Sequence, residues 1–120
     1  MTMPVIHIYS PKSKAPQGLL ARLSNEILDE LQLPPNHAWM LWHPVSPENA
    51  FKPGWEGDQP APIVVMYCKS RYTEEQVVRV MNIVQKVLSE KCSCDPDEIF
   101  MTVQRVHPYH LLARGTIWKG

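Results

Sequence analysis

The sequence has no excess charge of either sign, because 12 Lys and Arg residues balance 12 Asp and Glu residues and give a formal net charge of zero. Binding to nucleic acid or to an anionic membrane through the overall field of the protein is therefore not expected. Long apolar runs are also missing: stretches such as Ile63 to Cys68 are far shorter than the roughly 20 residues of a membrane span. With no charged-then-apolar leader at the start, we expect a protein of the cytoplasm that does not contact a membrane.

Glycine and cysteine are scarce. The five glycines are widely dispersed and form no phosphate-cradling loop, so no nucleotide cofactor is expected. The three cysteines, Cys68, Cys92 and Cys94, are odd in number, and no second cysteine pair or His-x-x-x-His stretch completes a zinc site. We interpret them as reduced thiols and expect neither a cofactor nor a metal.

Proline is abundant, with 12 residues, but 44% hydrophobic content can still supply a core. At 120 residues the chain is long enough for one core and too short for two independent ones, so we expect a single domain over residues 1–120.

The first part of the chain has the pattern of a β-α-β unit over about residues 3–45. Met3 to Tyr9 has the apolar and β-branched content of a buried strand. From Gln17 to Leu31, leucines and isoleucines recur at three- and four-residue steps, which predicts an amphipathic helix that ends before Pro34 and Pro35. Ala38 to His43 is short, apolar and aromatic, as in a second strand.

After a loop at residues 46–60, the pattern repeats over about residues 61–108. Pro62 to Tyr67 echoes Pro4 to Tyr9, 58 residues later. Thr73 to Gln76 resembles a capping box, and the helix predicted from there is followed by a fourth strand, Ile99 to Val106. In the tail, residues 109–120, Leu111 to Trp118 is predicted to be an extra strand that could cross to a neighbouring subunit.

Two tandem β-α-β units predict an α/β (α+β) fold with a four-stranded mixed sheet and two helices on one face. The other face of the sheet is left bare. Its strand residues are too apolar for water, so we expect it to be buried against other subunits.

The repeated strands with their leading prolines, the basic turn Lys12-Ser13-Lys14 and the second turn Lys69 to Gln76 together resemble the tautomerase superfamily, which includes 4-oxalocrotonate tautomerase and macrophage migration inhibitory factor (MIF). The resemblance covers essentially the whole chain and implies a homotrimer. It also implies a small carboxylate substrate or ligand, and a catalytic proline exposed as the amino terminus.

Pro4 is the residue that matches the catalytic proline. As a free secondary amine it would be a general base for moving a proton between carbon and oxygen of an enolisable 2-keto acid, since apolar surroundings and nearby cations lower the pKa of an amine. If Met1, Thr2 and Met3 remain attached, the nitrogen of Pro4 is a tertiary amide without basicity. Pro4 would then only begin an edge strand, where no ladder N–H is needed.

Cations should bind the substrate carboxylate. By resemblance, the candidates for substrate binding are Lys14, Lys69, Arg71, Tyr72 and His37. Arg114 is a further candidate for substrate binding and, with Arg105, for a carboxylate clamp. Alternatively, the basic residues are solvated turn residues and His37 bonds to backbone.

The sequence leaves three functions open. The first is a cofactor-free isomerase or lyase with Pro4 as base, and the second is a non-catalytic trimeric binding protein that keeps the anion pocket. The third is a structural or cytokine-like interaction module, for which no residue identifies a protein partner.

Overall fold

The computed structural model describes residues 4–120, so Met3, predicted to begin the first strand, lies outside the described residues. Each predicted helix and main strand is present to within about two residues. The elements are β1 Val5–Ser10, α1 Leu19–Leu31, β2 Trp39–Pro44, the short 3-10 helix η1 Pro47–Asn49, β3 Ile63–Lys69, α2 Glu74–Lys91, the 3-10 helix η2 Pro96–Glu98, β4 Phe100–Val106, β5 Leu112–Ala113 and β6 Thr116–Ile117.

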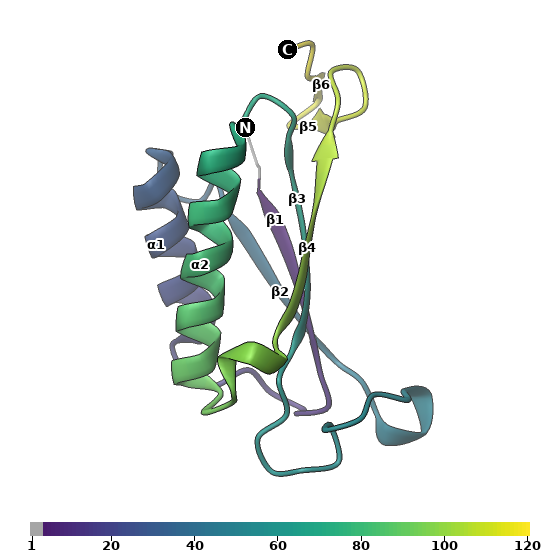
Figure 1. Cartoon of the computed structure of the whole chain (residues 1–120). Helices are drawn as coiled ribbons and strands as arrows, with labels where there is room; N and C mark the ends of the chain where they lie inside the picture. The colour runs from purple at the N-terminus through teal and green to yellow at the C-terminus, as the bar shows by residue number, and fades with distance from the viewer. Residues whose placement is uncertain (1–3) are drawn as a thin grey trace.

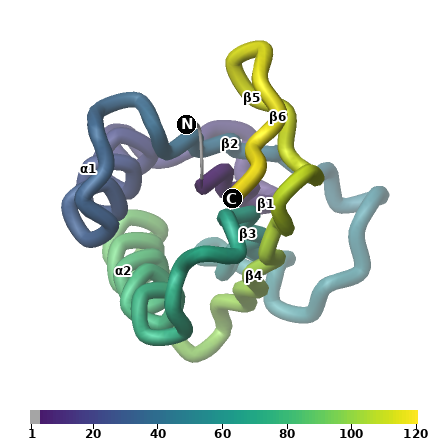
Figure 2. The backbone as a smooth tube through the Cα atoms, turned by 90° about the horizontal axis from the view of Figure 1, so that it is seen from above, coloured from purple at the N-terminus to yellow at the C-terminus, as the bar shows by residue number. Residues whose placement is uncertain are grey.

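The four main strands form one mixed sheet in the order β2-β1-β3-β4. Each β-α-β unit contributes a parallel pair, β1 with β2 and β3 with β4, and the antiparallel pair of β1 with β3 joins the two units. Both helices cover the same face of this sheet (Figures 1 and 2). The predicted architecture is confirmed.

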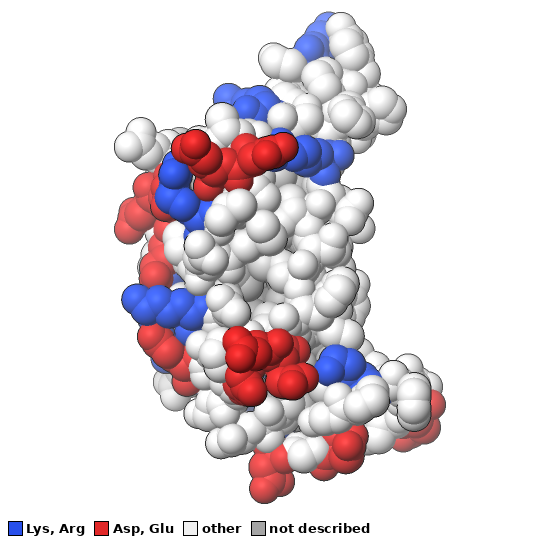
Figure 3. All heavy atoms as spheres, in the orientation of Figure 1, with Lys and Arg blue, Asp and Glu red and all other residues white. Residues whose placement is uncertain are grey.

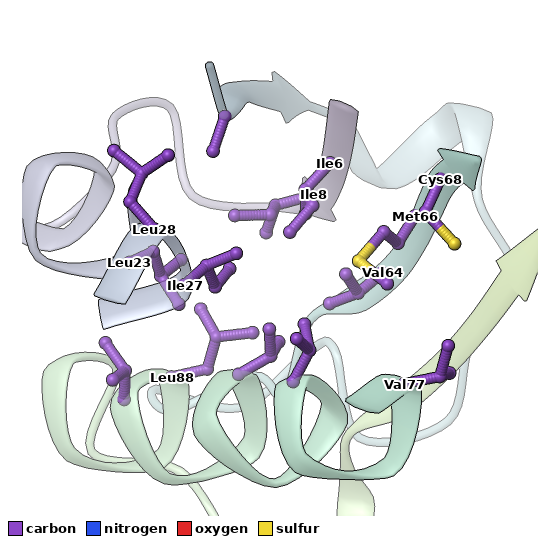
Figure 4. Packing of buried hydrophobic residues seen from close by; sticks show 14 of the residues in the cluster. Ile6, Ile8, Leu23, Ile27, Leu28, Val64, Met66, Cys68, Val77 and Leu88 are labelled. Carbon is purple, nitrogen blue, oxygen red and sulfur yellow. The ribbon is translucent and has the colours of Figure 1, made fainter. Parts of the chain in front are cut away.

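Strand alternation separates the two faces of the sheet. In β1 and β3 the residues Ile6, Ile8, Val64 and Met66 are buried. They meet the apolar stripes of α1 and α2, including Ile27 and Leu88, in one core (Figure 4). The helices therefore bury one face only, and the alternate strand residues point away from them.

The face of the sheet opposite the helices, here called the bare face, is apolar and partly exposed. Its exposed large apolar residues are Trp39, Leu41, Tyr67 and Phe100, one or more from each of β2, β3 and β4. In the view of Figure 3 the charged side chains gather over the helices and at the two ends of the molecule, and the strand side between the ends is mostly uncharged.

The start of α2 follows the sequence prediction in detail. The Thr73 side chain accepts a hydrogen bond from the backbone N–H of Gln76, and the Gln76 side chain accepts one from the backbone N–H of Thr73. This reciprocal pair is the predicted capping box. The first helix begins at Leu19 rather than Gln17, because Gly18 precedes it in a left-handed conformation, φ 78°.

Two predictions need correction. The tail is not one extra strand: β5 and β6 pair only with each other, because Arg114 (φ 53°) and Gly115 (φ 76°) form a two-residue turn between them. Pro4 does not begin an edge strand, because β1 lies between β2 and β3. A proline is tolerated there because it precedes the first paired residue of the strand.

Among residues 4–120, no helix combines the length and the apolar character that crossing a membrane requires.

Candidate functional site

Pro4 lies at one end of the sheet, directly before β1, with its side chain fully buried. Its carbonyl oxygen accepts a hydrogen bond of 3.0 Å from the backbone N–H of Trp39, the first residue of β2. His37, two residues before Trp39 and half-buried, therefore belongs to the same end. The parallel pairing of β1 and β2 thus brings two of the predicted site residues, Pro4 and His37, to the same end of the sheet.

The second turn reaches the same end because β3 runs antiparallel to β1. Val5 pairs with Tyr67, so Lys69, Arg71 and Tyr72, which come after Tyr67 in the chain, lie at the end of the sheet where Pro4 lies. Only 4% of Lys69 is exposed, and its Nζ lies 5.1 Å from the ring centroid of Trp118. Burial, with a smaller contribution from the charge of Arg71, lowers the pKa of Lys69 from its usual value.

Arg71 and Tyr72 differ in exposure. The guanidinium carbon of Arg71 lies 5.2 Å from the ring centroid of Tyr72, and Arg71 itself is exposed. Tyr72 is buried and belongs to the hydrophobic core. Arg71 can therefore meet a ligand carboxylate from solvent, whereas the ring of Tyr72 supports the turn from inside.

Arg105 fixes this turn. Its Nη1 donates to the backbone carbonyl of Ser70 at 3.1 Å and to that of Tyr72. The predicted carboxylate clamp is therefore occupied by the backbone of its own chain. In this structure Arg105 positions Lys69 and Arg71 rather than leaving its own guanidinium open to a ligand.

Lys14 is not brought together with Pro4 within one chain. It follows the far end of β1, and a strand of six residues is about 20 Å long. There Lys14 lines a cavity of about 170 Å³ together with Lys12, Lys91 and Pro60. A site that used both Lys14 and Pro4 would need a second copy of the chain.

Arg114 is exposed at the tip of the β5–β6 hairpin. Figure 1 places this hairpin beyond the end of the sheet at which β1 begins. Arg114 thus forms part of the turn of the hairpin, and Trp118, which follows β6, is the tail residue whose ring lies near the Lys69 amine. No role for Trp118 was predicted, because only the folded tail brings it to Lys69.

The larger cavity of the molecule does not lie at the end of the sheet where Pro4 and Lys69 are found. A larger cavity, about 650 Å³, lies beside the loop at residues 46–60, at the opposite end from Pro4, and is lined mainly by proline and aromatic residues such as Phe51 and Trp55. Within residues 4–120 there is no group of three or more His, Cys, Asp or Glu side chains that could hold a metal ion.

No protein-family model and no curated protein matches this sequence. Solved structures do match. A fused 4-OT wild-type asymmetric trimer is 12% identical with a TM-score of 0.82, and 94% of each chain is covered. Pt0534 inactivated by 2-oxo-3-pentynoate is 16% identical with a TM-score of 0.82, covering 95% of this chain and 94% of that one. MIF from Oncomelania hupensis is 17% identical with a TM-score of 0.79, covering 98% and 83%.

The chain therefore has the fold shared by fused 4-OT and MIF structures. This is the tautomerase-superfamily fold that the sequence resemblance predicts.

Proposed function

We propose that the chain is a cofactor-free, tautomerase-like isomerase or lyase that acts on an enolisable 2-keto acid, with Pro4 as general base once it is the amino terminus. The observation that carries this proposal is that Pro4, directly before β1, and the turn of Lys69 and Arg71, at the end of β3, belong to the same end of the sheet. The Pt0534 structure, inactivated by a 2-oxo acid, supports the substrate class.

The chemistry needs an amine that is partly unprotonated near neutral pH. An amino-terminal group titrates at about 7.7 to 8.0, and apolar surroundings with nearby cations lower that pKa further. Arg71 would bind the substrate carboxylate by charge-assisted hydrogen bonds, and Pro4 would remove a proton from the carbon next to the keto group. The same proton returned to oxygen or to another carbon completes the isomerisation.

The test compares two forms of the chain, one beginning at Met1 and one beginning at Met3, from which the initiator methionine is removed. We expect enol–keto exchange on an aromatic pyruvate only in the form that begins at Pro4. In that form Pro4→Ala should abolish exchange while the chain stays folded. Equal exchange rates before and after the Pro4 substitution would remove Pro4 from the mechanism.

A second candidate is a non-catalytic binding protein that keeps the anion site. The complete burial of Pro4 favours it, because a base must reach its substrate. Carboxylate binding by both forms of the chain, without turnover by either, is the result that this candidate predicts.

Both candidates include self-association as a homotrimer through the bare face. The exposed apolar residues of that face support this part of the proposal, as do the similar fused 4-OT structures, which are trimers. Sedimentation equilibrium of the purified chain gives the molar mass directly, and a monomer would contradict it.

A further inference from the structure

Lys69 is unusually buried for a lysine. Lysine is almost never fully buried unless it is paired with an acid. Among the described residues the ion pairs join Arg22 and Arg79 to glutamates, and Lys69 takes part in none of them. The charge that acts on it most clearly comes from Arg71, which has the same sign.

The surroundings of Lys69 favour an uncharged amine. Burial penalises the ammonium form, and Arg71 repels it. The indole face of Trp118 acts in the opposite direction, because it attracts a cation. The net result is a lowered pKa, and a desolvated lysine beside another cation is the usual arrangement of an amine that acts as a nucleophile.

Lys69 also lies at the end of the sheet that holds the candidate site. It follows the paired residues of β1 and β3 at the end of the sheet where Pro4 lies, and Arg71 is two residues away. Arg105 holds the turn between them through its hydrogen bonds to Ser70 and Tyr72. A 2-keto acid whose carboxylate meets Arg71 would bring its carbonyl close to the Lys69 amine.

The ring centroid of Trp118 lies 5.1 Å from the Lys69 amine, but the backbone of Trp118 is not part of the main sheet. The backbone of Trp118 bonds to Leu111 and Tyr109, both within the tail. The β5–β6 hairpin pairs with no strand of the main sheet. A shift of the tail would therefore uncover Lys69 while the four-stranded sheet stays intact.

We propose that Lys69 is a second reactive amine of the site and forms an imine with the carbonyl carbon of a small 2-keto acid. The neutral Nζ adds to the carbonyl carbon, a C–N bond forms and the oxygen takes up a proton. The resulting carbinolamine loses water to give the imine. This step takes its substrate class from the proposed function, but it does not need a free amine at Pro4.

The experiment uses the full chain beginning at Met1, in which the nitrogen of Pro4 is an amide and cannot form an imine. The chain is incubated with pyruvate and sodium cyanoborohydride near neutral pH, which reduces an imine to a stable carboxyethyl amine. Peptide mapping by mass spectrometry locates the adduct. We expect roughly tenfold more adduct on Lys69 than on any of the exposed lysines Lys12, Lys14, Lys86 and Lys119.

Lys69→Arg keeps the charge and the stacking on Trp118 but removes the nucleophile, so the dominant adduct should disappear. Lys86→Arg, on the exposed side of α2, is the matched control and should leave the labelling of Lys69 unchanged. Equal labelling of all lysines in the unsubstituted chain would overturn the proposal and leave Lys69 with a structural role only. Neither outcome depends on enol–keto exchange by a chain that begins at Pro4, so the two proposals fail separately.

Discussion

His7 and His43 share a hydrogen bond across the bare face of the sheet, with 2.8 Å between Nδ1 of His7 and Nε2 of His43. Their rings are stacked, with centroids 5.0 Å apart. Tyr9 stacks on His43 at 4.6 Å, and Tyr67 meets His7 edge-on at 5.8 Å. One imidazole must donate a proton and the other must accept it, so the hydrogen bond is lost when both are protonated.

This pair predicts a loss of stability in mild acid. Burial first, and the charge of His43 second, lower the pKa of His7 below its ordinary 6.5. The unfolded chain then binds more protons than the folded chain as the pH falls below about 6.5, so the free energy of unfolding falls with it. Urea unfolding between about pH 7.5 and pH 5.5 measures the slope. His7→Phe should flatten the slope, whereas His110→Phe, at an exposed tail position, should not.

A carboxylate on the bare face should prevent self-association. Leu41 in β2 is 43% exposed in the single chain, and Leu41→Glu would bury an unpaired charge in the proposed interface, at a cost of several kcal/mol. Val78→Glu is the matched control, because Val78 is 49% exposed on α2, away from the bare face. Sedimentation equilibrium should give a monomer for Leu41→Glu and the unsubstituted mass for Val78→Glu. Two unchanged masses would place the interface elsewhere.

The capping box of α2 should contribute measurably to folding. Thr73→Ala removes the side-chain acceptor for the backbone N–H of Gln76, which should lower the free energy of unfolding by about 1 kcal/mol. Urea denaturation measures this difference. Ser13→Ala, at an exposed turn position, is the control and should change stability by less than about 0.5 kcal/mol. An equal effect of both substitutions would show that the cap is not the cause.

The fold was predictable because local patterns agree with the global arrangement. The echo of Pro4 to Tyr9 at Pro62 to Tyr67 identifies the two units, and the apolar periodicity of α1 and α2 selects the face that packs on the sheet. The capping box could be located almost to the residue because its hydrogen bonds lie within four residues of sequence.

The candidate site was less predictable because it depends on contacts that are distant in sequence. Trp118 reaches Lys69 only through the folded tail, and no local pattern signals that contact. Lys14 is predicted from its spacing of ten residues after Pro4. The extended strand β1 lies between them, however, so the two residues are at opposite ends of that strand. Arg105 was predicted to be a carboxylate clamp, but in the structure its guanidinium donates to the carbonyls of Ser70 and Tyr72, a contact that no local sequence pattern indicates.

Arg105 gives a prediction that connects folding to the site. Arg105→Met keeps the apolar stem but leaves the carbonyls of Ser70 and Tyr72 without their donor, which should lower the free energy of unfolding by about 2 kcal/mol. Arg79→Met is the control, because the ion pairs of Arg79 with Glu30 and Glu75 lie at the surface and should contribute at most about 1 kcal/mol.

The same substitution should disturb the cationic turn. With its anchor removed, Lys69 and Arg71 are no longer held together, so carboxylate binding measured by calorimetry should weaken in Arg105→Met and stay unchanged in Arg79→Met. Weaker binding with unchanged stability would mean that Arg105 contacts the ligand itself. Lower stability with unchanged binding would instead separate the anchor from the site, because the turn would then keep its geometry without Arg105.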